Sequence, residues 1–138
     1  MDRGALGRFV DAQAPVYDRV RLELKAGRKE SHWMWFIFPQ IAGLGQSPMS
    51  IRFAIASLDE AKAYLAHPVL GPRLMECARL ALDVEGRAAR DIFGAIDEMK
   101  FRSSMTLFAR AASDEEVFQR CLDKYFAGSL DPATLARL

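Results

Sequence analysis

The sequence predicts an all-α protein, a single compact domain over residues 1–138 that is built from about seven short helices. Two patterns indicate this fold class: apolar residues recur at intervals of three and four along most of the chain, and helix-capping residues stand between these stretches. Hydrophobic residues make up 51% of the chain, which is enough for one core at this length. No repeat or linker marks an internal boundary, so we expect one domain.

The first helical stretch spans residues 9–24, where apolar side chains recur at helical spacing. Pro15 interrupts it, and we expect a new turn or a kink there because proline lacks the backbone donor that a helix interior needs. Gly27 is a natural end for the second part. Ser31 is a suitable N-cap for a helix over residues 32–38, which is apolar nearly all round and must be buried on most sides. A short buried strand is the alternative for this segment.

The segment at residues 49–56 fits both a helix and a short extended strand. Ser47 followed by Pro48 is typical of a helix start. The next residues, MSIRFAIA, alternate as in a strand. We favour a helix because the chain offers few partner strands, and a lone strand leaves its backbone groups unpaired. The preceding loop, IAGLGQSP, has two glycines that would let backbone amides approach an anion, although a plain turn is the favoured explanation.

Helix signals dominate after this point. Ser57 and Glu60 have the spacing of a capping box, in which Glu60 would answer the Ser57 backbone amide. His67, which precedes a proline, is expected to close that helix as a cap or packing residue. A further amphipathic helix is predicted over residues 70–82, and residues 91–94 are predicted to form a short turn.

The last third of the chain repeats this pattern of caps and apolar faces. Asp97 is suited to cap a helix that runs to about residue 112. Ser113 and Glu116 have the spacing of a second capping box, whose helix ends before the next glycine. Asp131, directly before a proline, is expected to open a short terminal helix.

Composition and charge exclude several kinds of partner. The net charge is +1, and neither half of the chain is strongly basic, so no extended nucleic-acid surface is expected. The aromatic block HWMWFIF is far shorter than the ~20 residues of a membrane helix, and the N-terminal MDRGALGRFV lacks the apolar core of a signal peptide. Cys77 and Cys121 lie in amphipathic patterns and are expected to be core thiols, with a disulfide or a catalytic thiol as the alternative. These features predict a soluble, cytoplasmic protein.

Four stretches together resemble a known family. They are GRKESHWMWFIFPQIAGLGQS, SLDEAKAYLAHPVLGPRL, MKFRSSMTLF and KYFAGSLDPATL. They resemble the DUF1810 family over nearly the whole chain, and the tryptophan-rich block and SSMTLF are the specific parts. The resemblance implies a mainly α-helical, bacterial-type protein of this length and brings no known activity. The stretch GAIDEMK departs from the pattern, because such proteins often carry a proline before the lysine.

The segment MKFRSSMTLF places a lysine and two serines on one face of a helix. Lys100, Ser103 and Ser104 are spaced i, i+3 and i+4, and each helical residue advances about 100°. Together they offer several hydrogen-bond donors to an anion or another polar ligand. A solvated surface stripe needs only the same residue types, so both interpretations stay open. Covalent catalysis is disfavoured, because the order of the familiar Ser-Lys motif is reversed and no oxyanion loop is evident.

A second group of candidates brackets the aromatic block. It consists of Lys29, Ser31, His32, Trp33, Trp35 and Gln40. His32 is either a buried histidine bonded to a backbone carbonyl or a donor and acid–base group beside an aromatic floor, with Trp35 at i+3. The two tryptophans are two residues apart and face opposite sides of a helix, so at least one belongs to the core. Gln40 would then accept an indole N–H or face a ligand.

Two functional hypotheses follow. In the first, the two groups converge, and His32, Lys100 and Ser103 surround a small polar or anionic, nucleotide-like ligand against a tryptophan wall. In the second, the protein is a non-catalytic interaction domain with the tryptophan-rich block as core or partner groove. Neither hypothesis identifies a cofactor or decides whether the protein is an enzyme. No metal is expected, since the two histidines are far apart and no cluster has ligand spacing.

Overall fold

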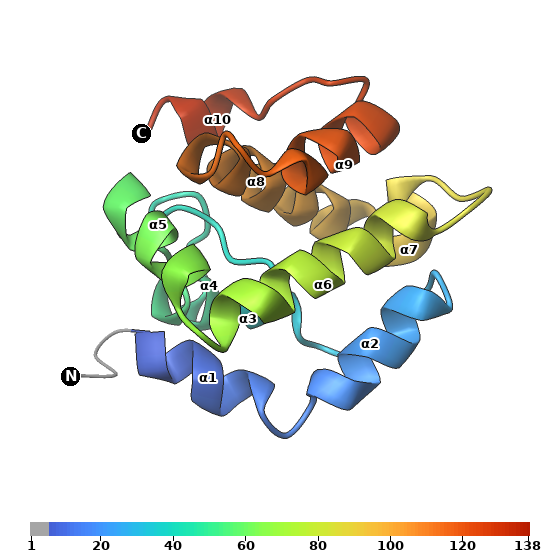
Figure 1. Ribbon diagram of the computed structural model, residues 1–138, viewed down its shortest axis with the longest axis horizontal. Coiled ribbons are helices and arrows are strands. Elements are labelled where there is room, and N and C mark those ends of the chain that lie inside the picture. Colours follow the sequence, from blue (N-terminus) through green and yellow to red (C-terminus); the bar gives the residue numbers. More distant parts are fainter. Residues whose placement is uncertain (1–5) are drawn as a thin grey trace.

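The computed structural model describes residues 6–138, which form ten helices (Figure 1). They are α1 (Gly7–Gln13), α2 (Tyr17–Lys25), α3 (Met34–Ile37), α4 (Pro48–Arg52), α5 (Leu58–Ala66), α6 (Leu70–Asp83), α7 (Ala89–Phe93), α8 (Ala95–Ala111), α9 (Glu116–Phe126) and α10 (Pro132–Leu135). The all-α prediction is confirmed. The number of about seven helices is wrong, because short pieces that were expected as turns or kinked continuations, such as α7, form helices of their own.

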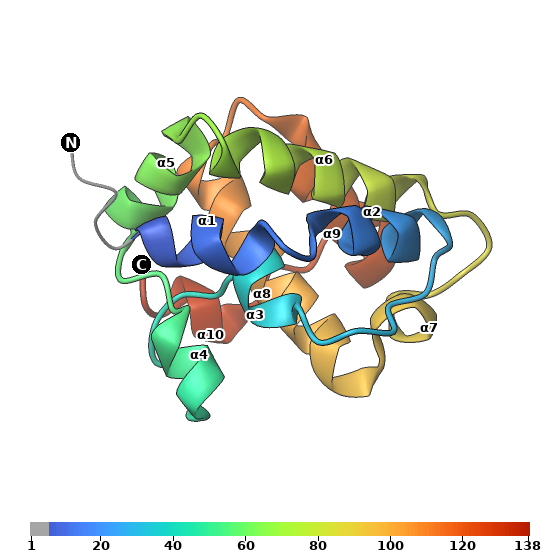
Figure 2. The ribbon, with the colours of Figure 1, turned by 90° about the horizontal axis from the view of Figure 1, so that it is seen from below.

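The N-terminal helices α1 and α2 follow one another along one side of the molecule (Figure 2). They are separate helices because Pro15 lies between them, as the sequence predicts. Gly27 follows α2 with a φ of +71°, a backbone conformation that favours glycine, and this predicted end is also confirmed. Helix α2 packs against α6. After Gly27 the chain passes toward α7, where the amide of Lys29 donates to the carbonyl of Ile92.

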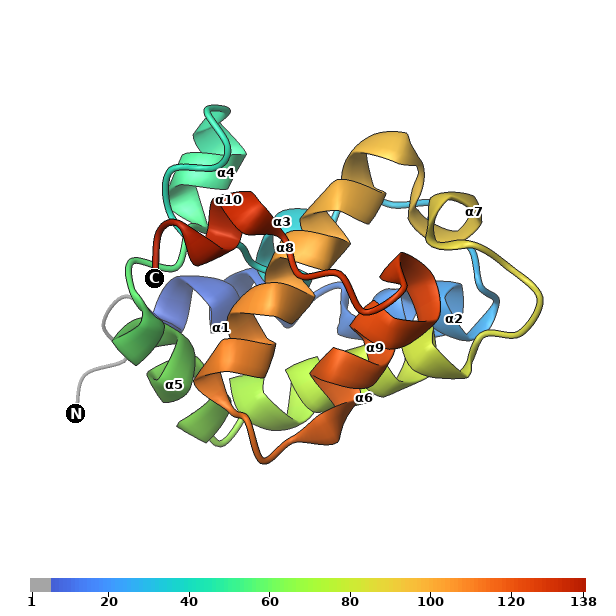
Figure 3. The same ribbon diagram turned by 90° about the horizontal axis from the view of Figure 1, so that it is seen from above.

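Helix α8 is the centre of the domain. It packs against α5, α7, α9 and α10, and Figure 3 shows α10 lying across it. Residues 103–108 are all buried, so this part of the helix is enclosed on every side, although Ser103, Ser104 and Thr106 are polar. Near its start the Phe101 ring stacks on Phe93 at 4.5 Å and meets Phe38 edge-on at 5.0 Å. The core therefore joins the aromatic block to the SSMTLF segment.

Three predicted helix caps are confirmed. The Ser47 side chain accepts a hydrogen bond from the amide three residues further on and starts α4, with proline in the first turn. The Asp131 carboxylate starts α10 in the same way. His67 ends α5, and its Nδ1 accepts hydrogen bonds from the amides two and three residues later, at the entry to α6.

The two predicted capping boxes differ from the expectation. Ser57 accepts from the Glu60 amide at 3.1 Å as predicted, but the Glu60 carboxylate accepts from the amide of Ala56 at 2.7 Å rather than from that of Ser57. The prediction of a capping box at Ser113 is wrong. Helix α9 begins only at Glu116 and has no side-chain cap, so Ser113 stands outside the helix that it was expected to start.

The segment at residues 49–56 combines the two predicted conformations. Its first half is the helix α4, which the sequence analysis favoured. Its second half is extended, and Ile55 forms an isolated parallel bridge with Ile41. The Ile55 amide donates to the carbonyl of Gln40 at 2.9 Å, and its carbonyl accepts from Ala42 at 2.8 Å. This bridge fixes the position of the loop that follows the aromatic block.

Both cysteines are core thiols, as predicted. Cys77 and Cys121 are buried and not joined by a disulfide, and burial raises the pKa of each to about 12, so both stay protonated at neutral pH. Within residues 6–138 no helix has the length and apolar character needed to cross a bilayer. The first five residues, which belong to the stretch inspected for a signal peptide, lie outside the described part of the chain.

Candidate functional site

A cavity of about 300 Å³ lies where the first half of α8, the loop after α3 and the start of α10 meet. Its volume is at the small end of the range for ligand sites. Its lining comes from three segments that are distant in the sequence: Gln40, Leu44, Gly45, Ile96, Met99, Lys100, Arg102, Ser103, Asp131 and Ala133. Polar groups and aliphatic side chains therefore share one small recess.

Three of the residues singled out in the sequence line this cavity: Gln40, Lys100 and Ser103. The side-chain amide of Gln40 has no hydrogen-bond partner among the described residues, so it is available to a ligand. Ser103 is buried, and its Oγ donates to Asp131 Oδ2 at 2.9 Å. The interpretation of this serine as part of a solvated stripe is therefore wrong, because the C-terminal segment covers it.

Lys100 lies within a small charged cluster. Its Nζ is 3.6 Å from Asp97 Oδ1 and 5.2 Å from the centre of the Trp35 ring. Asp97 was expected to cap α8, but it lies in the first turn of that helix instead. Its carboxylate also pairs with Lys29 Nζ at 2.9 Å. Two ammonium groups thus share one carboxylate, and the cluster keeps a net positive charge beside the cavity.

Two further charged residues attach the C-terminal segment to α8. The Arg102 guanidinium donates to two backbone carbonyls and a serine hydroxyl of residues 129–130, all of them neutral acceptors. Asp131 Oδ2 accepts from Ser103 Oγ and from the amide and hydroxyl of Thr134, while Oδ1 has no partner within residues 6–138. The arginine therefore adds a positive charge to the lining that forms no ion pair with a carboxylate among the described residues.

The residues that precede the aromatic block are held by Glu23. Its carboxylate accepts hydrogen bonds from the amides of Glu30 and Ser31, from Ser31 Oγ at 2.6 Å, and from the indole N–H of Trp33 at 2.9 Å. Burial by itself raises the pKa of Glu23, but these hydrogen bonds outweigh it and lower the pKa to about 2. Ser31 therefore does not cap α3, and Gln40 does not accept the indole N–H, because Glu23 takes both partners.

The expected tryptophan wall and histidine are not part of the cavity lining. Trp33 is fully buried in the core, and Trp35 contributes only through the lysine that lies over its ring. His32 is exposed, because α3 begins at Met34 and leaves the histidine outside the helix. The interpretation of His32 as a buried residue is wrong. Ser104 is buried with no partner for its Oγ among the described residues, and it does not line the cavity either.

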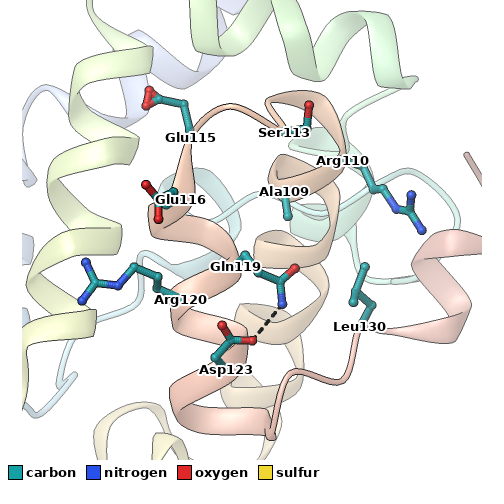
Figure 4. A pocket seen from close by; sticks show the side chains of 9 residues that line it. All are labelled: Ala109, Arg110, Ser113, Glu115, Glu116, Gln119, Arg120, Asp123 and Leu130. Atoms are coloured by element: carbon teal, nitrogen blue, oxygen red, sulfur yellow. Dashed lines mark hydrogen bonds between the residues drawn. The ribbon is translucent and has the colours of Figure 1, made fainter.

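A larger hollow of about 550 Å³ lies on the outer face of α8 and α9 (Figure 4). Its charged side chains do not converge: Arg110 and Arg120 point in opposite directions, and Gln119 is bonded to Asp123 at 3.0 Å. Such an arrangement offers a ligand no focused set of donors. Across residues 6–138 no three histidine, cysteine or acidic side chains gather in a way that would hold a metal ion. The smaller cavity is therefore the candidate site.

Comparison with known proteins places the chain in a family. A family model described as "Protein of unknown function (DUF1810)" matches residues 3–138. The chain belongs to the DUF1810 family. A solved structure, that of the conserved hypothetical protein Rv1873 from Mycobacterium tuberculosis, is 55% identical to this DUF1810 chain, with a TM-score of 0.97 over 99% of this chain and 98% of that one. No curated protein matches this chain.

Sequence analysis of this DUF1810 chain missed most of the lining, including four large side chains: Ile96, Met99, Arg102 and Asp131. A signal existed for the first pair, because two large apolar residues stand at i and i+3 in an otherwise polar first turn. They are 72% and 70% exposed at the cavity rim. No local signal existed for the second pair, since only the tertiary fold brings residues 129–133 back along α8.

Proposed function

We propose that this protein binds a small organic acid that carries an apolar group, in the cavity at the start of α8. The observation that carries this proposal is the convergence of Gln40, Lys100 and Ser103, from segments about 60 positions apart, in one recess whose remaining wall is largely aliphatic. A half-buried ammonium attracts an acid group, and the free amide of Gln40 supplies a directional hydrogen bond. The aliphatic wall would cover the apolar part of the ligand.

The charges around the cavity favour a singly charged acid. Three positive and two negative side chains lie in its lining or in the charged cluster that includes Lys100: Lys29, Lys100, Arg102, Asp97 and Asp131. The resulting net charge of one suits a carboxylate better than a polyphosphate. A nucleotide-like ligand, which the sequence suggested, has less support because no aromatic ring is among the lining residues to stack a base.

The arrangement supports binding rather than a chemical step. Ser103 carries the only hydroxyl among the residues that line the cavity, but the Asp131 oxygen that it contacts also accepts from the backbone and hydroxyl of Thr134. That oxygen already accepts three hydrogen bonds from the protein itself. We therefore assign this pair to holding the C-terminal segment against α8.

Isothermal titration with N-acetyl-leucine, its neutral amide and AMP tests the proposal. We expect the acid to bind the wild-type protein and Lys100→Gln to weaken its binding about tenfold or more. Folding should change little, since the ion pair of Lys100 with Asp97 is partly exposed and such pairs contribute roughly 0–1 kcal/mol. Lys62→Gln, at an exposed position on α5, is the matched control. Equal binding by the Lys100→Gln variant, or by the amide, would contradict the proposal.

A further inference from the structure

A second cavity, of about 190 Å³, adjoins the candidate site. Gln40 and Gly45 line both cavities, so both lie against the loop that follows the aromatic block. Its lining contains no charged side chain and includes Gln46, Ile51 and the backbone of residues 41–43. A ligand whose acid group lies near Lys100 would meet neutral side chains in this lining, and the Arg137 guanidinium lies against Gly43 at its edge.

Much of the backbone of this loop is free, although residues 42–43 form a turn. Within the described chain, the amides of residues 43–46 donate no hydrogen bond and the carbonyls of residues 42–45 accept none. The ends of the loop are nevertheless fixed, by the bridge between Ile41 and Ile55 and by the Ser47 cap of α4. A fixed segment with free donors and acceptors is able to pair with the main chain of an extended peptide.

Glycine at position 45 lets the loop lie close to α4. A Cβ atom there would come within 2.5 Å of the Ser50 side chain, so any larger residue would displace the loop from α4. Exposed apolar side chains flank both cavities: Ile51 is 63% exposed beside the second, and Met99 is 70% exposed beside the first. Large apolar side chains at the edge of a recess commonly mark a binding surface.

We propose that the acid is the C-terminal carboxylate of a peptide, an inference that rests on the proposed function. The terminal carboxylate lies near Lys100, and the last side chain packs on the aliphatic wall formed by α8. The preceding peptide groups pair with the free backbone of residues 42–46 in the neutral cavity. The single net charge of the first cavity and the neutral side chains that line the second match one terminal carboxylate followed by neutral amides.

Fluorescence anisotropy of the full chain with N-terminally labelled Gly-Gly-Ala-Leu tests this inference, with N-acetyl-leucine, the peptide amide and AMP as competitors. We expect the free-acid peptide to bind about tenfold tighter than N-acetyl-leucine, and its amide to lose about that factor. Ile51→Ser should weaken the peptide several-fold and leave N-acetyl-leucine unchanged. Leu22→Ser, 68% exposed on α2 and away from both cavities, is the control and should change neither.

The outcomes separate this inference from the function on which it rests. If N-acetyl-leucine binds as tightly as the peptide, or if Ile51→Ser weakens both equally, the peptide inference is overturned and the acid site stands. If neither acid binds, or if Lys100→Gln binds both as the wild type does, the acid site itself is overturned. If AMP displaces the peptide more strongly than N-acetyl-leucine does, the ligand is a nucleotide and the peptide inference is again wrong.

Discussion

Replacing Glu23 by glutamine should destabilise the protein strongly at pH 7 and much less at pH 3. The carboxylate is buried and accepts four hydrogen bonds from the segment that carries Ser31 and Trp33. Glutamine keeps the size of the side chain and removes its charge, so the variant stands in for the protonated glutamate. Hydrogen bonds to a charged acceptor are stronger than those to a neutral one, and all four lose that advantage.

The magnitude follows from the pKa of Glu23, which falls from 4.5 to about 2 on folding. Because the folded-state pKa is depressed, the ionised group contributes stability above pH 4.5 and loses it as the pH falls toward 2. The full contribution is about 3 kcal/mol at pH 7, and roughly 1.4 kcal/mol remains at pH 3. The difference between wild type and Glu23→Gln should therefore shrink by about half over this interval.

Urea unfolding followed by tryptophan fluorescence measures this difference at both pH values. Glu85→Gln, at an exposed position after α6, is the control and should change the free energy of unfolding little. A destabilisation by Glu23→Gln that is the same at pH 7 and pH 3 would refute the reasoning. The cause would then be a packing or shape effect of glutamine rather than the loss of charge.

Two further predictions concern single positions. Gly71→Ala should prevent the close packing of α6 against the end of α5, because a Cβ atom there would lie 2.1 Å from the Leu65 carbonyl oxygen. We expect urea unfolding to show a loss of more than about 2 kcal/mol in the free energy of unfolding. A loss below about 0.5 kcal/mol would contradict the close approach. His32→Ala should leave both the melting temperature and the affinity for N-acetyl-leucine unchanged, since the side chain is exposed and lies outside the cavity lining. A loss of binding of about tenfold would show that His32 contributes to the site.

The sequence predicted those features that depend on neighbours in the chain. The break at Pro15, the end at Gly27 and the caps at Ser47 and Asp131 need only local backbone chemistry, and all four are present. Predictions that needed a partner elsewhere in the chain were less secure. Ser31 was predicted to be a helix cap from its immediate neighbours in the sequence. Its hydroxyl instead donates to the Glu23 carboxylate, which lies eight positions earlier and on another helix.

The predictions for the candidate site show the same difference between local features and features that depend on distant parts of the chain. Helical spacing placed Lys100 and Ser103 on one face correctly, but it made no distinction between a face that meets solvent and one that meets another segment. The assignment of His32 depended on a helix that was expected two residues before the observed start of α3. An error of this size at a helix end moves a side chain by more than half a turn, which is enough to take it out of a site.

The cavity depends on how the C-terminal segment is held. Helix α10 has four residues and buries only Thr134, so apolar contacts alone do little to hold it. Its attachment is instead polar: Arg102 binds the carbonyls of residues 129–130, and Asp131 is bonded to Ser103 and Thr106 of α8. The side chains of α8 that hold this segment therefore lie in or next to the cavity wall. A ligand that contacts Arg102 or Ser103 would act on the same bonds that keep α10 in place, so occupancy of the cavity and docking of the C-terminal segment are physically linked.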